Sequence, residues 1–244
     1  LNPMSISNNG FSFFQKTPIV QDGYGLWIGS NNGLNYYDIE KNLFRRFYSS
    51  DNKNTISGNQ INTLHIDDEF LWVGTNFGLD KITLEGQSIE RMAYNAWFSM
   101  TGMYAVTQII PFQKNNTMEG GFWMSTYSGL VYYDKNMDSW YDVEHELVFG
   151  KPINNILQDT NGNLWIDMNG ELVLFNTTSF YYQYGSIAEE DIVLVEHDIK
   201  NKQSILDVSL SALVSHPQYG TWLGTPRGVS NCLLYTSPSP RDRG

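Results

Sequence analysis

A tryptophan-centred motif recurs five times along the chain and constrains its fold more than any other feature. It reads LWIGSNNGLNYYD in the first copy and LWVGTNFGLDKIT in the second. Successive copies are separated by 45, 51, 42 and 57 residues, and their tryptophans are Trp27, Trp72, Trp123, Trp165 and Trp222. A repeat of this length that carries short strands is typical of a β-propeller or a related array.

Turn residues divide each copy into short strands. An apolar run such as Ile61–Asp67 comes first, an Asp/Asn/Gly turn leads into the Leu-Trp-Ile strand, and a second turn starts a third strand. Segments such as Leu43–Tyr48 supply a fourth strand, and Ser99–Ile110, where helix and strand are both open, is expected to be strand from Val106 onward. The pattern predicts an all-β chain of four-stranded antiparallel propeller blades, five of them in an incomplete ring.

Glycines recur two and six positions after the tryptophan. They suit turns that need a positive φ, which glycine adopts without steric cost. The recurring glycines are Gly29, Gly74 and Gly224 at the first position and Gly33, Gly78, Gly129 and Gly228 at the second. Three departures put the local turn geometry in question: Ser125 and Asp167 replace the first glycine, and Glu171 replaces the second, with Gly170 one place earlier.

The five tryptophans are interpreted as packing residues. A buried tryptophan removes about 150–250 Å² from water, which at about 25 cal/mol per Å² gives roughly 4–6 kcal/mol as an upper bound. A residue that recurs in every blade is expected to fill the space between blades, because a ligand rarely contacts every blade alike. We therefore expect all five indole rings to be buried.

Composition limits the classes of partner. The 244 residues carry a net charge of −11, which disfavours binding to nucleic acid. No run of 18 apolar residues occurs, so any membrane attachment is expected only through segments downstream of this sequence. No signal peptide is recognisable before the first repeat, so the chain is expected to begin after one or to be a fragment.

The last residues break the repeat. Cys232–Asp242 reads CLLYTSPSPRD, which resembles the translation of a transposon sequencing adaptor. We therefore expect a partial propeller over residues 1–231 and a non-native tail over residues 232–244. Because Cys232 is the single cysteine, no disulfide or cysteine metal site is expected before it.

The motif D-x-x-G-x-L-W-I-G-T-x-x-G-L-x-x-Y-D resembles the two-component regulator propeller repeat, over about residues 11–231. Residues 22–38 match it closely, as do 71–79 and 159–165. The resemblance implies seven-bladed propellers in the periplasmic sensor region of hybrid histidine kinases of Bacteroidetes. It also implies an oligosaccharide as candidate ligand, signalling to genes of glycan use, and a homodimer as candidate assembly of the full-length receptor.

Catalytic residues, metal ligands and cofactor sites are not recognisable in the sequence. The four histidines lack metal-ligand spacing, and His65 is interpreted as a core or blade-face residue. Binding is the better hypothesis, because amide and aromatic side chains suited to sugar rings fall in the turns between second and third strands and in the connections between blades. The candidate ligand-binding residues are Asn32, Phe77, Trp97, Tyr104, Tyr127 and Arg227. A propeller enzyme acting on glycans, as a lyase or hydrolase, and a non-catalytic protein-interaction scaffold remain as alternatives.

Overall fold

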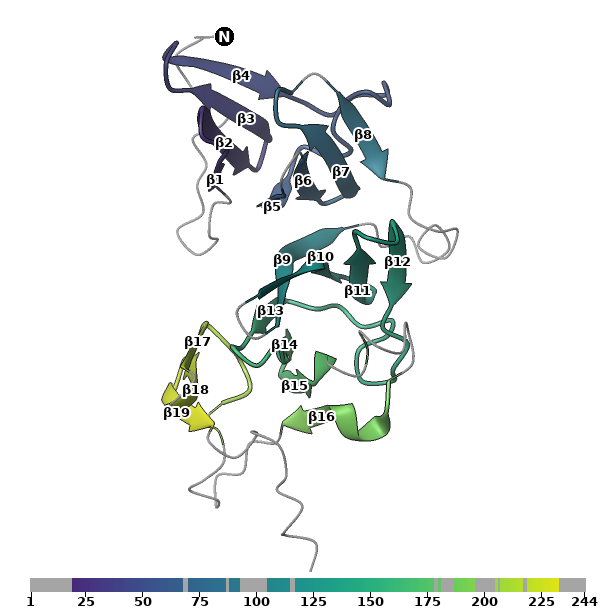
Figure 1. Ribbon diagram of the computed structural model, residues 1–244, viewed down its shortest axis with the longest axis vertical. Coiled ribbons are helices and arrows are strands. Elements are labelled where there is room, and N and C mark those ends of the chain that lie inside the picture. Colours follow the sequence, from purple (N-terminus) through teal and green to yellow (C-terminus); the bar gives the residue numbers. More distant parts are fainter. Residues whose placement is uncertain are drawn as a thin grey trace, which may run out of the picture. The chain divides into compact units, whose positions relative to one another are not determined.

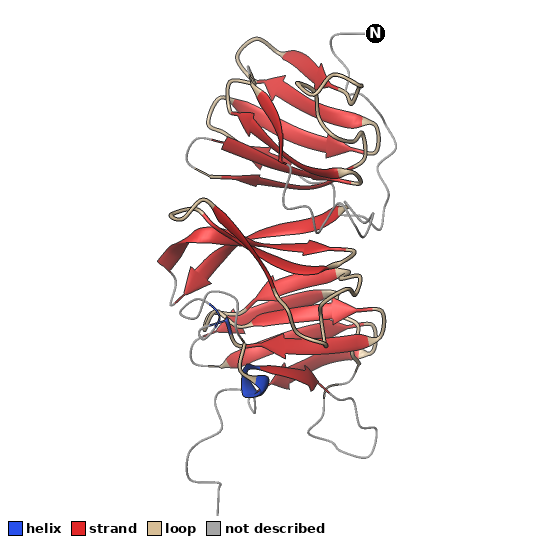
Figure 2. Cartoon of the chain, turned by 90° about the vertical axis from the view of Figure 1, so that its right-hand side faces the viewer, coloured by secondary structure: helices blue, strands red, loops and turns tan. Residues whose placement is uncertain are grey.

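Short β-strands make up most of the regular structure (Figure 2). The computed structural model describes residues 19–67, 70–86, 88–92, 105–114, 117–177, 180, 187–195, 205, 207–216 and 219–232. The strands form five sheets, four of them four-stranded and the last three-stranded, and in each sheet the strands follow one another in chain order. The sheets correspond one to one with the five sequence motifs. This confirms the predicted all-β architecture of propeller-type blades.

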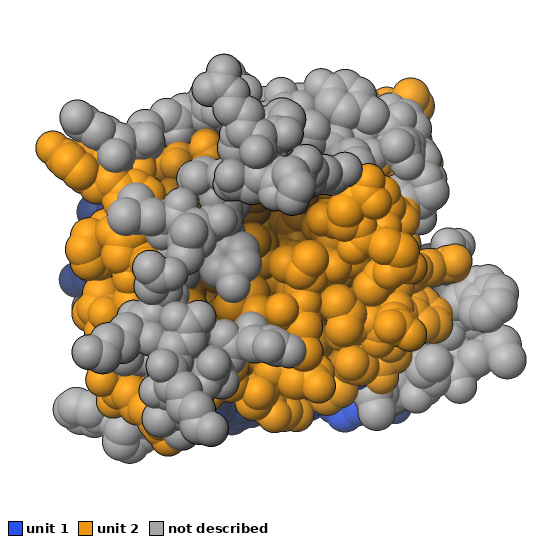
Figure 3. Space-filling model, turned by 90° about the horizontal axis from the view of Figure 1, so that it is seen from below, with its two compact units in different colours: residues 1–111, 122–131 blue, residues 112–121, 132–244 orange. Residues whose placement is uncertain are grey.

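The chain divides into two compact units, coloured separately in Figure 3. The first consists of residues 1–111 and 122–131, and the second of residues 112–121 and 132–244. The division passes through the third sheet, which consists of β9 (Val106–Lys114), β10 (Thr117–Thr126), β11 (Gly129–Asp134) and β12 (Ser139–Asp142). The strand β9 begins where the sequence predicts, at Val106.

The first unit contains the first two complete sheets (Figure 1). The first sheet consists of β1 (Ile19–Gln21), β2 (Gly25–Ser30), β3 (Gly33–Asp38) and β4 (Leu43–Phe47). The second consists of β5 (Ile61–Ile66), β6 (Phe70–Thr75), β7 (Gly78–Thr83) and β8 (Ile89–Met92). Strand pairing in both sheets is antiparallel throughout.

The second unit contains the fourth and fifth sheets. The fourth consists of β13 (Asn155–Gln158), β14 (Leu164–Met168), β15 (Glu171–Phe175) and β16 (Ile192–Val195), with the 3-10 turn η1 (Glu189–Asp191) before β16. The fifth consists of β17 (Ala212–His216), β18 (Gly220–Thr225) and β19 (Gly228–Cys232). The last strand thus extends through Cys232, one residue past the predicted boundary of the propeller at residue 231.

An aspartate before the second strand fixes the tryptophan in three of the sheets. Asp22 accepts hydrogen bonds from the backbone N of Gly25 and from Nε1 of Trp27, at 2.8 and 3.0 Å. The indole Nε1 of Trp72 donates to Asp67 at 2.9 Å, and that of Trp165 to Asp159 at 3.4 Å. One carboxylate therefore closes the turn and satisfies the polar atom of the buried indole, which explains the aspartate of the motif.

The tryptophan rings fill the space between successive sheets within each unit. Trp27 is fully buried in a cluster that includes Ile61 and Leu64 of β5, so the second sheet covers it. In the second unit, Trp165 packs with Leu210 and Leu223, which belong to the next sheet and its connection. Trp72 and Trp123 are each 1% exposed, so four of the five predicted core tryptophans are confirmed.

The prediction that Trp222 is buried is wrong. Its side chain is 41% exposed, and Val214, which lies opposite it on β17, is 65% exposed. Trp27, Trp72 and Trp165 each pack against residues of the sheet that follows or its connection, but within the described residues no sheet follows β19. The sequence motif is the same as in the other blades, and only the covering surface differs.

The turns between second and third strands follow the glycine pattern, with one change. Gly33, Gly78, Gly129 and Gly228 all have positive φ values, as predicted. In the fourth sheet the positive φ values shift to Asn169 (32°) and Gly170 (95°), which form a two-residue Asn-Gly turn. Glu171 can therefore replace the usual glycine, because it is an ordinary extended residue that pairs with Met168.

Candidate functional site

The turns that carry the predicted ligand-binding residues are held by a recurring side-chain bond. A hydroxyl at the end of the second strand donates to the carbonyl oxygen of the glycine that begins the third. The bonds are Ser30 Oγ to Gly33, Thr75 Oγ1 to Gly78, Thr126 Oγ1 to Gly129 and Thr225 Oγ1 to Gly228, at 2.8, 3.3, 2.9 and 3.0 Å. Residues at the tips of these turns are therefore presented on a fixed backbone.

The predicted ligand-binding residues do not all lie in one unit of the structure. In the first unit Asn32 is exposed, Phe77 is 62% exposed and Tyr127 is 48% exposed. Arg227 lies in the second unit, where its Nε is 3.2 Å from a carboxylate oxygen of Asp207. Trp97 and Tyr104 lie outside the described residues.

Phe77 borders a polar hollow at the ends of the first two sheets where β2 and β6 terminate. The hollow has a volume of about 760 Å³, a size suited to a small organic ligand. Asn31, the neighbour of Asn32, lines it from the first sheet, but Asn32 itself does not. Its lining consists of Asn31, Ser49, Ser50, Asp51, Ser57, Gly58, Asn59, Gln60, Asn76, Phe77 and Arg91. We refer to this set as the polar hollow.

The connection between the first two sheets, residues 48–60, forms one wall of the polar hollow and is well bonded. The carbonyl oxygen of Asn59 accepts from the backbone N of Gly33 at 2.7 Å, and its side-chain Oδ1 accepts from the backbone N of Ser49 at 2.7 Å. The carbonyl oxygen of Gln60 accepts from the backbone N of Asn76 at 3.1 Å. The wall is thereby tied to the turns of both sheets.

Gly58 lies where the wall meets the β6–β7 turn. A Cβ atom at this position would lie 2.4 Å from Oδ1 of Asn76 and 2.9 Å from Oγ1 of Thr75. Any larger residue at this position would therefore force the side chain of Asn76 to move. The close approach brings the side chains of Asn76 and Phe77 beside the wall.

Arg91 of β8 fixes the outer part of the wall. Its Nε donates to the carbonyl oxygen of Thr55 at 2.8 Å, and its Nη2 donates to the carbonyl oxygens of Ser50, Asn52 and Ile56 at 2.7, 3.2 and 3.0 Å. One guanidinium group thus gathers four backbone carbonyls of a segment without regular structure. The same side chain also lines the polar hollow.

Asp80 of β7 binds the inner part of the wall at Ser57. One carboxylate oxygen, Oδ2, accepts from the backbone N and the Oγ of Ser57 at 2.8 and 3.0 Å. Ser57 Oγ in turn lies 2.8 Å from Oγ1 of Thr75, which accepts from the backbone N of Phe77 at 3.0 Å. Burial raises the pKa of Asp80 to about 6, although the two bonds from Ser57 oppose the shift.

The chemistry of the polar hollow suits a hydroxyl-rich ligand. Amide side chains and serine hydroxyls both donate and accept hydrogen bonds. Asp51 adds a negatively charged acceptor, and Arg91 adds a positively charged donor. Phe77 offers an exposed aromatic face beside them. Polar groups that fix orientation next to an apolar ring are the usual features of a small-ligand site.

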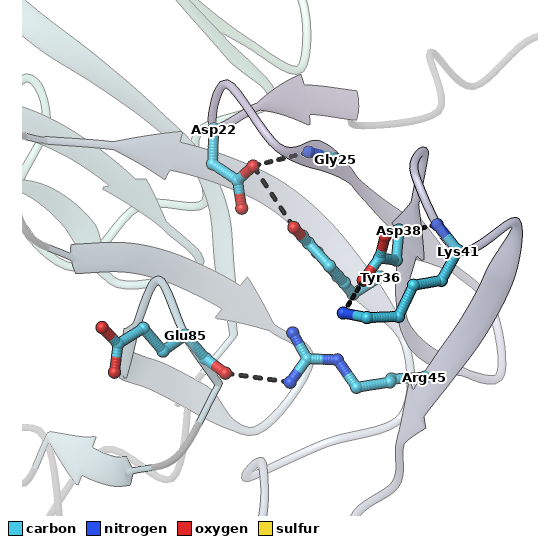
Figure 4. A network of polar contacts seen from close by, with 7 residues as sticks. All are labelled: Asp22, Gly25, Tyr36, Asp38, Lys41, Arg45 and Glu85. Carbon is cyan, nitrogen blue, oxygen red and sulfur yellow. Dashed lines mark hydrogen bonds and ion pairs between the residues drawn. The ribbon is translucent and has the colours of Figure 1, made fainter.

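A second hollow, of about 580 Å³, is lined by residues before β2, by residues of β3, β4 and the turn between them, and by residues after β7 (Figure 4). Its polar groups largely bond to one another. Asp22 accepts from the backbone N of Gly25 and from the hydroxyl of Tyr36, and Asp38 accepts from Nζ of Lys41. Arg45 donates to the carbonyl oxygen of Glu85 at 2.9 Å. The Arg45 guanidinium also lies 4.6 Å from the centre of the Tyr36 ring. Because Asp22 belongs to the recurring aspartate–tryptophan bond, this network is mainly scaffold.

Sequence reasoning identified the β2–β3 and β6–β7 turns but missed Arg91, Ser57 and Asp80. The one available signal was the register of the second sheet, because Asp80 and Arg91 occupy directly opposite positions on β7 and β8. An acid and a base facing each other across a hairpin can be read from strand lengths. Their contacts with residues 50–57 depend on how the connection folds back.

Several other kinds of site are not found in the described part of the chain. Within it, no group of three or more His, Cys, Asp or Glu side chains could hold a metal ion. No described helix is long and apolar enough to span a bilayer. His65 is half-buried, with its ring centre 5.7 Å from that of Phe122, as expected for a histidine on a blade face.

The sequence is similar to a histidine kinase. Over 154 residues, or 62% of this chain, it is 27% identical to "Histidine kinase P4" of Formosa agariphila. The chain covers 11% of that protein. No family model matches the chain.

The structure is similar to solved extracellular domains. It matches the extracellular domain of the putative hybrid two component system BT4673 from B. thetaiotaomicron with a TM-score of 0.66 and 21% identity, over 87% of this chain and 26% of that one. It matches PorZ, a bacterial surface component of the type-IX secretion system of Porphyromonas gingivalis, with a TM-score of 0.57 and 13% identity, over 85% and 30% of the two chains.

These likenesses confirm the predicted resemblance to hybrid two-component sensor proteins and the propeller-type fold. Of the proteins matched, one is the extracellular domain of a hybrid two component system and one is a histidine kinase. The chain spans about a quarter of the BT4673 domain and about a tenth of the kinase.

Proposed function

We propose that this chain is part of the periplasmic ligand-sensing region of a hybrid two-component histidine kinase and that its polar hollow binds an oligosaccharide. The observation that carries the proposal is the polar hollow itself, where amides, hydroxyls and one charge of each sign surround the exposed ring of Phe77. Hydrogen-bonding groups around an aromatic face match the alternating hydroxyls and apolar faces of a sugar ring.

The signalling part of the proposal concerns the whole receptor. Ligand binding at the propeller would favour one of two receptor arrangements, and the kinase would pass the change to genes of glycan use. A homodimer joined to the membrane through downstream segments is the proposed assembly. Recovery of the complete gene tests this part: a membrane helix and a kinase core are expected, and their absence would end the receptor interpretation.

The binding part is tested on a panel of purified oligosaccharides, with calorimetry for each one retained. Phe77→Ala removes the aromatic face without removing a hydrogen bond of the wall. Because an aromatic contact contributes about 1 kcal/mol, the variant is expected to bind roughly fivefold more weakly. A complete panel with no bound oligosaccharide would contradict the proposal.

Tyr24→Ala is the matched control for this variant. Tyr24 is also an exposed aromatic residue of the first unit, 76% exposed, but it lies at the opposite end of β2 and lines the second hollow. Its removal is expected to leave the affinity unchanged. Assay of the same mixtures for new reducing ends separates binding from hydrolysis or lyase activity, and release of product would favour the enzyme alternative.

A further inference from the structure

Two oppositely charged side chains, Asp80 and Arg91, bind the wall of the polar hollow. Asp80 and Arg91 face each other in the register of β7 and β8. Arg91 binds the carbonyl oxygens of Thr55 and Ile56, and Asp80 accepts from the backbone N of the next residue, Ser57. The wall is therefore anchored at consecutive residues by a cation and by an anion.

The two anchors differ in their access to solvent. Arg91 is only partly buried, whereas Asp80 is 0% exposed. Only one of the two carboxylate oxygens of Asp80 is hydrogen-bonded, and the other, Oδ1, has no hydrogen-bond partner in the described structure. An ionised carboxylate that is buried and half-bonded is costly, so hydration favours any motion that exposes it.

We propose that Asp80 is a positioning residue whose ionised form makes the wall of the polar hollow open more often, so that access to the hollow depends on pH. The effect on ligand binding rests on the proposed function, but the motion of the wall does not. In the protonated form the carboxyl group tolerates burial and the wall stays closed. In the ionised form, water that enters as Ser57 moves away solvates both oxygens.

The competing effect is the pair of bonds from Ser57, which favours the ionised, closed form. The geometry of the carboxylate opposes these bonds, because both of them reach Oδ2 while Oδ1 is buried without a hydrogen-bond partner in a side chain that is 0% exposed. The direction of the pKa shift agrees with this balance: burial raises the pKa of Asp80 to about 6 from 3.8 against the bonds from Ser57 and the attraction of Arg91. Among the described residues, Arg91 is the charged group that acts on Asp80 from the elements packed against it.

The expected change follows from the two pKa values. If opening restores the ordinary pKa of Asp80, the open fraction of the wall is about tenfold higher at pH 7.5 than at pH 5. Opening also moves the β6–β7 turn, because Ser57 Oγ is linked through Thr75 Oγ1 to the backbone N of Phe77. The wall and the aromatic face would therefore loosen together.

Amide hydrogen exchange resolved by NMR, expressed as protection factors to remove the intrinsic pH dependence, tests the proposal. The protection factor of the Ser57 amide is expected to be about tenfold higher at pH 5 than at pH 7.5. The Thr83 amide is the internal control, since it lies at the other end of β7 and donates to the uncharged carbonyl oxygen of Ser88 at 3.1 Å. Its protection factor is expected to change less than twofold, because an amide at the end of a strand exchanges through local opening that does not expose Asp80.

Asp80→Asn is the matched variant, because it keeps the size of the side chain and cannot ionise. Its Ser57 amide is expected to show equal protection at both pH values. A flat or reversed profile for Ser57 in the natural chain would overturn the proposal, as would parallel changes in Ser57 and Thr83. If the variant does not fold, the comparison of the two amides in the natural chain decides alone.

The outcome is independent of the ligand. Because exchange is measured without oligosaccharide, a flat Ser57 profile would leave the proposed function standing. If no oligosaccharide binds, the proposed function fails, but a pH-dependent protection factor of the Ser57 amide would still support the motion of the wall.

Discussion

Replacing Asp80 with asparagine should remove a pH dependence from the stability of the folded chain. Asp80 is completely buried, and burial raises its pKa to about 6 from 3.8. Between these two values the folded state binds more protons than the unfolded state. The contribution of Asp80 to stability is therefore fully present below pH 3.8 and is lost as the pH rises through 6.

The magnitude follows from the same two pKa values. Integration between pH 5 and pH 7.5 gives a loss of about 1.4 kcal/mol in the free energy of unfolding from this one group. The carboxylate of Asp80 has little screening by solvent, so no discount for exposure applies. Asparagine has no proton to exchange, and this component should vanish in the variant.

Urea unfolding followed by tryptophan fluorescence at both pH values measures the effect. The other carboxylates titrate alike in both proteins, so their contribution cancels when the pH-induced change in the variant is subtracted from that in the natural chain. A remaining difference of about 1.4 kcal/mol, with the natural chain relatively more stable at pH 5, is expected. A difference near zero, or one of opposite sign, would refute the reasoning that burial controls Asp80.

Three further predictions test the scaffold and the polar hollow. Trp165→Ala should lower the free energy of unfolding by about 3–5 kcal/mol, whereas Trp222→Ala, at a half-exposed position, should cost less than about 1 kcal/mol in the same denaturation assay. Asp159→Ala removes the acceptor of the Trp165 indole and of two turn amides, and should lower the melting temperature through a loss of about 1–3 kcal/mol. Gly58→Ala forces Asn76 to move, and calorimetry should show weaker oligosaccharide binding with the fold, measured by circular dichroism, retained.

Features that depend on local sequence could be predicted. The Asp-Trp-Gly pattern specifies a turn, a strand and a second turn within about 20 residues, and three of the blades contain the aspartate–tryptophan bond. The strands and the buried positions of Trp27, Trp72, Trp123 and Trp165 followed from that pattern. Local chemistry was sufficient for the strands and turns, because each blade forms from adjacent hairpins. Burial of these tryptophans also needs the sheet that follows.

Features that depend on the neighbouring blade could not be predicted. Trp222 carries the same motif but is exposed, since burial requires a covering sheet that the motif does not encode. Phe77 was found because it lies in a recognisable turn. Arg91 was missed because its partners, such as Ser50, lie about 40 residues earlier in a connection of irregular structure.

The most direct test of the account locates a bound oligosaccharide on the chain. A photoreactive diazirine analogue of the oligosaccharide retained from the panel would be cross-linked, and the labelled peptides would be identified by mass spectrometry. The account predicts labels on residues 49–51 and 57–60 and on Asn76 and Phe77, which line the polar hollow. Labels confined to Tyr24, Leu43 and their neighbours around the second hollow would contradict it.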